Sequence, residues 1–257
     1  MENNSTFFYN QTINIFTDAS CLTLKPNRGD VQSTSPGFLA TYGGRIIASG
    51  LEAYIGENSM YGESKAIEIA IDWCIHAASS GIFVPQGYSI FSDNNPTIQK
   101  ICNTLISWFN ILENKESNGI LPREKMSVVS FEANAYNAAF SIFTSGLPIR
   151  LFYVVSHVNL RPFSHVKQQE KFLRINKPIH GDLSDDLTIA ILHEQATFNN
   201  MVDIMTRNYL IRNQNQIEQD INYLNSDIDF NNKIVPIRWP FLSQQVSRYL
   251  YQPLFLN

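Results

Sequence analysis

Four carboxylic acids occupy positions in the sequence where a metal-dependent hydrolase would need them: Asp18, Glu63, Asp93 and Asp203. The first and third each end a short apolar run that is typical of a strand, and the other two each lie near the start of a helical stripe. Carboxylates that converge in a poorly solvated place repel one another unless a cation lies among them. The pattern therefore predicts a Mg²⁺ site and, as its chemistry, the metal-assisted hydrolysis of a phosphodiester.

Each acid also has an ordinary structural explanation when it is taken alone. Glu63 could complement the dipole of a helix that begins there, and Asp93 could cap the helix that follows it. Asp18 has no obvious helix to cap, and Asp203 lies inside a helical stripe, where aspartate is a poor helix former. Because four separate explanations would be needed, a shared metal site accounts for the acids better.

Other residues that could carry chemistry are expected to be structural. Glu68 and Asp72 follow a separate stripe of the Glu63 helix, which is expected to face solvent. Trp108 is expected in the core rather than against nucleic acid. The cysteines have neither zinc-finger nor redox spacing and are expected to be buried thiols: Cys21, Cys74 and Cys102.

The composition excludes several classes of protein. The chain has 257 residues, is 44% hydrophobic and has a formal net charge of −4, so it can bury a full core, and any contact with nucleic acid must use a local basic patch. No apolar run approaches the ~20 residues that span a bilayer, and residues 1–11 lack the pattern of a secretory signal. We therefore expect no membrane association. Because the chain has so few cysteines, we also expect an intracellular, reducing compartment such as the cytoplasm.

Residue alternation, turn residues and helical spacing predict a mixed α/β fold. The expected strands are residues 12–17, 37–42, 45–53, 88–92 and 149–156. The expected helices are residues 63–78, 96–109, 131–143 and 199–212. Residues 159–195 are expected to be irregular, with one short helix at residues 187–193. This order predicts a five-stranded sheet, with three antiparallel strands and then two parallel ones, flanked by helices.

Five short motifs, taken in order, resemble those of type 1 ribonuclease H over roughly residues 12–210. They are Thr17-Asp18-Ala19-Ser20, Glu63-x-x-Ala66-Ile67-x-x-Ala70-Ile71, Ser92-Asp93, Val154-Val155-Ser156-His157 and Asn199-x-x-Val202-Asp203-x-x-x-Arg207. The resemblance implies a ribonuclease H-like fold and an endonuclease that hydrolyses the RNA strand of RNA–DNA hybrids.

The resemblance also implies roles for individual residues. The four acids would hold two Mg²⁺ or Mn²⁺ ions, with Asp18 shared by both, Glu63 and Asp93 completing one site, and Asp203 the other. His157 would lie beside the ions, where it would move protons or help to release the product.

Two further residues are expected to contact the nucleic acid, namely Ser20 and Asn58. The residues directly before Glu63 lack the polar amides that the family usually carries there, so Asn58 is the nearest amide to that acid. Family members use such groups to read the ribose hydroxyls of the RNA strand.

The chain also departs from the family by an insertion, at about residues 159–197. Basic residues dominate its first half, and we expect Lys167, Lys171 and Arg174 to grip phosphates in place of the family's basic protrusion. An ordinary solvated loop is the open alternative. Three acids of the insertion could replace Asp203 as the fourth metal ligand: Asp182, Asp185 and Asp186.

The expected organisation is a domain at residues 1–212 and a C-terminal extension at residues 213–257. The extension is rich in aromatic residues and would pack on the domain, on a partner protein or on a second copy. Two competing functions stay open: another nuclease of the same fold, such as a junction resolvase, an integrase-like enzyme or a 3′–5′ exonuclease, and a non-catalytic nucleic-acid-binding scaffold.

Overall fold

Strand β1 (Ile13–Leu24) lies inside the sheet and carries the first of the predicted acids. It pairs antiparallel with β2 (Val31–Tyr42) on one side and parallel with β5 (Tyr88–Ser92) on the other. The computed structural model describes residues 11–24, 30–82, 86–113, 130–155, 162–227 and 237–238. Over these residues the sheet has seven strands in the order β6-β5-β1-β2-β4-β7, with β3 also pairing β2.

The remaining strands extend the sheet at its two edges. β6 (Ile149–Tyr153) runs parallel to β5, and β3 (Arg45–Leu51) runs antiparallel to β2. β4 (Tyr54–Ile55) continues along β2 beyond β3, and β7 (Ile237–Arg238) pairs with β4. The predicted fold class is confirmed by this topology, because β3, β2 and β1 are antiparallel and β5 and β6 continue parallel to β1. The two extra strands, β4 and β7, were not predicted.

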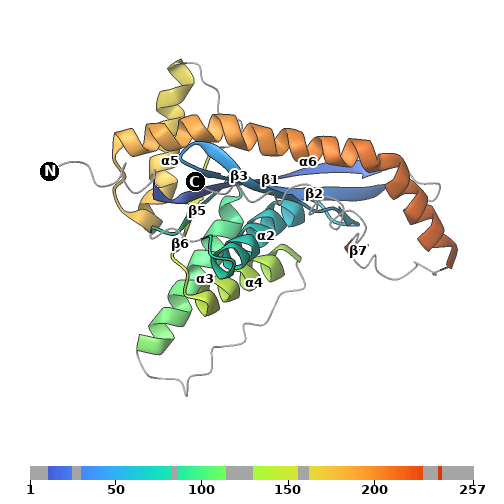
Figure 1. Cartoon of the computed structure of the whole chain (residues 1–257), viewed down its shortest axis with the longest axis horizontal. Helices are drawn as coiled ribbons and strands as arrows, with labels where there is room; N and C mark the ends of the chain where they lie inside the picture. Colours follow the sequence, from blue (N-terminus) through green and yellow to red (C-terminus); the bar gives the residue numbers. More distant parts are fainter. Residues whose placement is uncertain are drawn as a thin grey trace.

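Helices cover both faces of the sheet (Figure 1). α2 (Ser59–Ser79) packs on β1 and β2, and α4 (Ser130–Ser145) packs on α2 and on α3 (Asn95–Glu113). The long helix α6 (Asp185–Asp227) crosses the opposite face, against β1 and β2. α5 (Pro162–His180) joins β6 to α6 in space, since it contacts both.

A ladder of stacked aromatic rings fixes the register beside the predicted acids. The Phe16 and Phe91 ring centroids are 5.1 Å apart, and those of Phe91 and Phe152 are also 5.1 Å apart. These three residues are register partners on β1, β5 and β6. Phe198 of α6 packs on Phe16 with a centroid distance of 5.4 Å, which places α6 over the same point of the sheet.

The predicted strand at residues 37–42 begins six residues too late, because polar residues are buried in the first half of β2. Ser33, Thr34 and Ser35 have no exposed surface, and each hydroxyl donates a hydrogen bond to a backbone carbonyl. Satisfied hydroxyls can be buried at little cost, so the apolar–polar alternation that marks a strand is lost while the strand remains.

The prediction of an irregular segment at residues 159–195 is wrong over residues 162–180, where α5 lies, and the short helix predicted at residues 187–193 lies inside the much longer α6. A position of α5 that faces the core is taken by Asn176, which is fully buried and donates to Tyr153 O at 2.8 Å. Pro178 also lies inside the helix. A polar residue on the buried face and an internal proline hide the helical pattern in the sequence. α6 likewise runs past residue 213, the expected start of the C-terminal extension.

Two glycines let helices approach the sheet from opposite faces. A Cβ atom on Gly62 of α2 would lie 2.1 Å from Thr34 Oγ1 and 2.9 Å from Ala19 Cβ. A Cβ atom on Gly37 of β2 would lie 2.7 Å from the Thr206 Cγ2 atom of α6. Gly37 is the register partner of Asp18, so both close approaches occur beside that acid.

Replacing Gly62 with alanine is expected to destabilise the fold, although alanine favours a helix over glycine by about 1 kcal/mol. The new methyl group would clash with Thr34 and Ala19, and overpacking of this kind costs about 1–3 kcal/mol. Thermal melting followed by circular dichroism would measure the effect, with the exposed Ser79→Ala of the same helix as control. A Gly62→Ala protein as stable as the wild type would show that the close approach is dispensable.

Candidate metal centre

Asp18 and Asp93 come together because β1 outlasts its parallel neighbour. The register pairs Ile13 with Tyr88 and continues to Phe16 with Phe91. Two residues further along each strand it reaches Asp18 and Asp93, just beyond the last residue of β5. β1 continues to Leu24, so beyond this point its side toward β5 has no paired strand among the described residues. Side chains from both faces of the sheet can meet at this open edge of β1.

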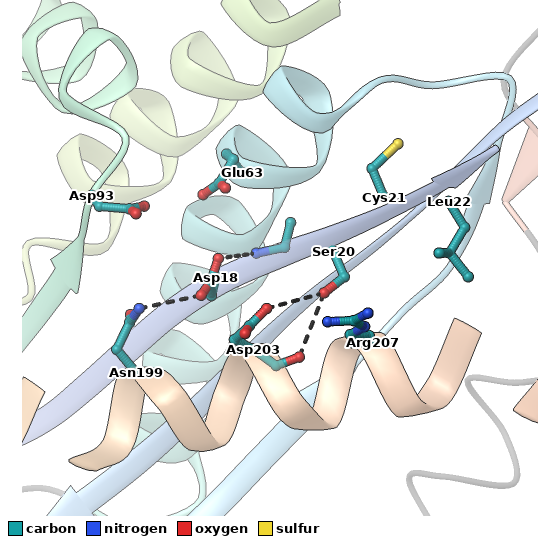
Figure 2. Close-up of a pocket in the computed structure, with 10 residues that line it drawn as sticks. Asp18, Ser20, Cys21, Leu22, Glu63, Asp93, Asn199, Asp203 and Arg207 are labelled. Atoms are coloured by element: carbon teal, nitrogen blue, oxygen red, sulfur yellow. Dashed lines mark hydrogen bonds between the residues drawn. The ribbon is translucent and has the colours of Figure 1, made fainter. Parts of the chain in front are cut away.

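Glu63 reaches this open edge from α2, and the three acids form one group (Figure 2). Asp18, Glu63 and Asp93 each offer a carboxylate oxygen, and these oxygens all lie within 4.8 Å of one another. Such a set of oxygens is the donor type that Mg²⁺ and Mn²⁺ prefer.

Asp203 approaches Asp18 from α6, on the side away from Glu63 and Asp93 (Figure 2). It lies outside the group of three but lines the same cavity, which has a volume of about 350 Å³. The Ser20 hydroxyl lies 3.4 Å from Asp203 Oδ1 and 2.9 Å from the Thr206 hydroxyl. Ser20 therefore ties β1 to α6 next to the acids.

Asn199 and Arg207 also line the cavity, one helical turn before and one turn after Asp203. The side-chain amide of Asn199 donates to Asp18 Oδ2 at 3.2 Å, while the Ala19 N–H donates to Asp18 Oδ1 at 2.7 Å. Both donors fix the Asp18 carboxylate. The sequence pattern contained Asn199 and Arg207 but gave them no role; their spacing of four from Asp203 was the available signal.

Burial and mutual repulsion disturb the titration of the acids. Burial raises the pKa of Asp18 to about 7, and the charges of Asp93 and Asp203 add to the rise, against the opposing Ala19 and Asn199 hydrogen bonds. Burial, followed by the charges of Asp93 and Asp18, raises the pKa of Glu63 well above its usual value. Without a cation, these carboxyl groups therefore hold protons that they would ordinarily release.

Two buried oxygens complete the case for a cation. Glu63 Oε2 and Asn199 Oδ1 are buried and accept no hydrogen bond from the described residues. An unsatisfied buried carboxylate oxygen is costly, and a bound cation or its water would satisfy it. The clustered acids, their raised pKa values and the unsatisfied oxygen all fit a divalent cation with oxygen ligands.

The structural explanations for the acids do not hold. Asn94, not Asp93, caps α3, since its side chain accepts from Thr97 N at 3.2 Å. α2 begins at Ser59, four residues earlier than predicted, and its first turn contains no acid. Glu63 is therefore not an acid placed at a helix start.

One expected surface acid is buried. Asp72 is exposed as predicted, but Glu68 is only 7% exposed. Burial raises the pKa of Glu68, and an ion pair with Lys65 at 2.9 Å opposes the rise. The prediction failed because α4 covers this side of α2, a contact between helices distant in sequence.

The acids of the insertion lie away from the cavity. Asp182 pairs with Lys177 at 2.6 Å, and Asp185 accepts from the Gln169 side chain at 3.2 Å. Asp182, Asp185 and Asp186 are exposed, and none lines the cavity.

The other predicted site residues of the described chain do not line the cavity. Asn58 is exposed and caps α2, since its side chain accepts from Tyr61 N at 3.0 Å. The three basic residues of the insertion are exposed on α5: Lys167, Lys171 and Arg174. His157 lies outside the described residues.

Trp108 and the cysteines can also be compared with expectation. Trp108 is 1% exposed and packs edge-on against Tyr136, so its predicted place in the core is confirmed. All three thiols are free. Cys74 is buried, but Cys21 and Cys102 are only half-buried. Cys21 follows Ser20 on β1, along the open edge, and therefore lines the cavity.

No protein-family model and no curated protein sequence matches the chain. Among solved structures, the chain is similar to LC9-RNase H1, described as a type 1 RNase H with the type 2 active-site motif. The likeness covers 75% of this chain and 85% of that chain, with 11% sequence identity and a TM-score of 0.34. A likeness this distant does not establish a family. Over the described residues, no helix is both long and apolar enough to cross a membrane.

The metal-free protein is expected to lose stability as the pH rises from near 3.8 to about 7, the ordinary and the raised pKa of Asp18. In this window the folded state binds more protons than the unfolded state, so the free energy of unfolding falls with pH. Urea unfolding with a chelator present would measure the slope, and Asp18→Asn should flatten it. Above this window, millimolar Mn²⁺ should raise the melting temperature of the wild type and not of Asp18→Asn. A pH-independent wild type without a metal response would contradict the site.

Proposed function

We propose that the protein is a metal-dependent endonuclease that hydrolyses the RNA strand of RNA–DNA hybrids. The observation that carries the proposal is the group of three carboxylates at the open edge of β1, with a fourth acid on α6 across the same cavity. The order of the sequence motifs, which resembles type 1 ribonuclease H, supports the choice of substrate.

The four acids would hold two Mg²⁺ or Mn²⁺ ions. Asp18 would be shared, with Glu63 and Asp93 on one side and Asp203 on the other. When bound, such ions lower the pKa of an attacking water and stabilise the charge on the leaving oxygen. Asn199 would keep the shared carboxylate in one orientation through its hydrogen bond to Asp18 Oδ2.

Neighbouring residues would handle the substrate. Arg207 is an exposed cation at the cavity and would contact a phosphate. Ser20 would contact the strand that lies along β1, and Asn58 the strand that approaches the start of α2. His157 would move a proton during bond cleavage or product release.

α5 would hold the phosphate backbone beside the cavity. Its basic residues are spaced by four and three, so Lys167, Lys171 and Arg174 lie on one face of the helix. His180 contacts Leu151 O and Asn176 contacts Tyr153 O, so α5 runs antiparallel to β6. Earlier residues of α5 therefore extend beyond the carboxyl end of β6.

That end of the sheet is the one that carries the acids. Tyr153 is the register partner of Ser92, which directly precedes Asp93. Lys171 Nζ lies 5.6 Å from the centre of the Tyr153 ring. Lys167 would lie about 13 Å farther along the helix axis than Asn176, at 1.5 Å per residue. The basic face would therefore lie on the same end of the sheet as the acids and would extend the phosphate contacts beyond the cavity.

The C-terminal extension, residues 213–257, would pack on the domain. The antiparallel pairing of Tyr54 with Arg238 supports this arrangement, because it adds a segment of the extension to the edge of the sheet. The alternative is that the extension forms an interface with a partner protein or with a second copy of the chain.

A labelled RNA–DNA hybrid should be cut in its RNA strand when Mg²⁺ or Mn²⁺ is present, and Asp93→Asn should abolish the cut because it removes one of the clustered carboxylates. Duplex DNA, duplex RNA and single strands are the parallel substrates. Preferential cutting of branched or duplex DNA would move the function to a resolvase-like or integrase-like enzyme. Binding without any cleavage would indicate a scaffold.

Charge reversal of the basic face, as Lys171→Glu with Arg174→Glu, should weaken hybrid binding. It should also make the slope of log binding constant against log salt concentration shallower by about one unit for each lost phosphate contact. Lys177→Glu is the control for a change of charge on the same helix, since Lys177 is already paired with Asp182. Fluorescence anisotropy at several salt concentrations would measure both quantities with a non-cleaving Asp93→Asn background. Equal affinity in all variants would remove α5 from the binding surface.

A further inference from the structure

Glu63 is held in the metal centre by its helix rather than by its own side chain. Its Oε2 atom is buried without a partner among the described residues, and its side chain forms a hydrogen bond with another acid, Asp93. A hydrogen bond between two acids would not hold the Glu63 carboxylate in place against their repulsion. The place of Glu63 therefore depends on how firmly the first two turns of α2 are fixed.

The sheet fixes one side of these turns. Gly62 lies against Thr34 and Ala19, where there is no room for even a methyl group. This contact limits how close α2 can come to the sheet. It does not prevent the helix from sliding or from moving away, so a second contact is needed on the other side.

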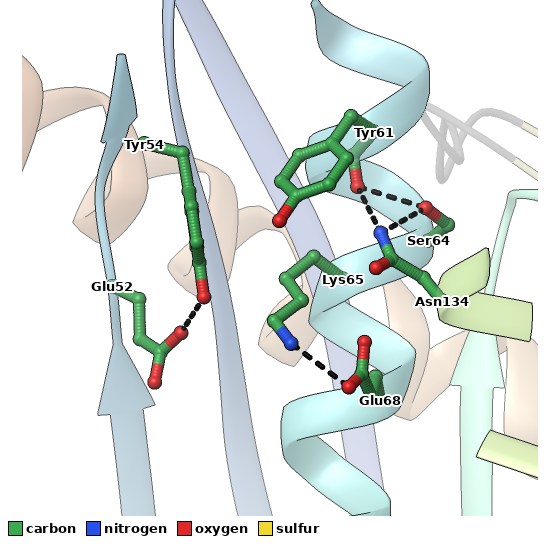
Figure 3. Close-up of polar contacts among 7 residues, drawn as sticks. All are labelled: Glu52, Tyr54, Tyr61, Ser64, Lys65, Glu68 and Asn134. Carbon is green, nitrogen blue, oxygen red and sulfur yellow. Dashed lines mark hydrogen bonds and ion pairs between the residues drawn. The ribbon is translucent and has the colours of Figure 1, made fainter. Parts of the chain in front are cut away.

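α4 supplies that contact through one buried side chain (Figure 3). The amide of Asn134 donates to Ser64 Oγ at 2.9 Å and to the Tyr61 carbonyl at 3.4 Å. The Ser64 hydroxyl in turn donates to the same carbonyl at 2.8 Å. Asn134 is 5% exposed and Ser64 is fully buried. The bonded residues flank Glu63 on both sides in the sequence.

A second contact follows one turn later. The buried Glu68 pairs with Lys65 at 2.9 Å, and both Lys65 and the Asn137 side chain of α4 oppose the rise that burial causes in the pKa of Glu68. Lys65 Nζ lies 6.0 Å from the centre of the Tyr54 ring on β4. Figure 3 shows the Lys65–Glu68 pair on α2, between Asn134 of α4 on one side and Tyr54 of β4 on the other.

The interface around this network is otherwise apolar on the α4 side. The neighbouring residues on α4 are small and fully buried, namely Ala135, Ala138 and Ala139. A satisfied hydrogen bond contributes only about 1 kcal/mol to stability. Its direction is specific, however, and a buried polar network selects one arrangement of the helices it joins.

From this arrangement we propose that Asn134 is a positioning residue of the metal centre. Through Ser64 and the Tyr61 carbonyl it fixes the height and rotation of the start of α2, and thereby places Glu63 beside Asp18 and Asp93. The proposal rests on the proposed metal-dependent function. Groups bonded directly to metal ligands typically change metal affinity about 10- to 100-fold when they are removed, and Asn134, which acts through the neighbours of Glu63, is expected to lie at the lower end of that range.

The test is Mn²⁺ binding to the full chain, measured by calorimetry without substrate. Asn134→Asp keeps the shape of the side chain but removes both donated hydrogen bonds, and Ser64→Ala removes one hydroxyl. Both variants are expected to bind Mn²⁺ about 10-fold more weakly. Ser64→Ala keeps the test decisive if the buried charge of Asn134→Asp prevents folding.

Two control variants separate positioning from stability. Asn14→Ala removes a buried asparagine at the amino end of β1, and Thr41→Val removes a buried hydroxyl that donates to Asn14 O. Melting temperatures with a chelator show which variants are destabilised. We call Asn134→Asp and Ser64→Ala the α2–α4 variants. The proposal predicts that they bind Mn²⁺ more weakly than control variants with an equal loss of melting temperature.

The outcomes distinguish this proposal from the proposed function. Equal Mn²⁺ affinity in wild type, controls and α2–α4 variants would overturn the role of Asn134 and leave the metal site in place. A wild type that binds no Mn²⁺ would overturn both. Selective loss of Mn²⁺ binding in the α2–α4 variants supports the role of Asn134, even if the wild type fails to cut an RNA–DNA hybrid.

Discussion

Carboxylates with oxygens within 4.8 Å of one another repel strongly in a place that water reaches poorly, and this repulsion is the constraint on which the rest of the molecule depends. The fold must hold Asp18, Glu63 and Asp93 together at a cost to its own stability. It meets that cost partly by protonation, as the raised pKa values of Asp18 and Glu63 show. A divalent cation would meet it better, because positive charge removes the repulsion itself.

The architecture concentrates rigidity at this one place. The stacked rings of Phe16, Phe91 and Phe152 lock three strands in register just before the strands reach the acids. Gly62 and Gly37 let a helix on each face come unusually close to the sheet at the same level. The acids therefore arrive from the sheet and from both helix layers, and each comes from an element that is packed tightly nearby.

The sequence predicted most of the strands and the acids of the site for simple reasons. Asp18 and Asp93 each follow an apolar strand, and parallel neighbours end at the same edge of a sheet, so their meeting is a direct consequence of topology. The prediction failed where polar residues are buried. Thr34 in β2 and Asn176 in α5 satisfy backbone groups, and a satisfied polar residue carries no periodic signal in the sequence.

The sequence by itself determined the order and direction of the five main strands, and it predicted the four acids that line the cavity, because these follow from local periodicity and strand order. Only the tertiary structure decided that Asn199 orients Asp18, that Asn134 holds the helix of Glu63, and that Glu68 is buried. Those facts depend on how helices distant in sequence dock against one another. Docking is set by the summed fit of many side chains, and no single stretch of residues records it.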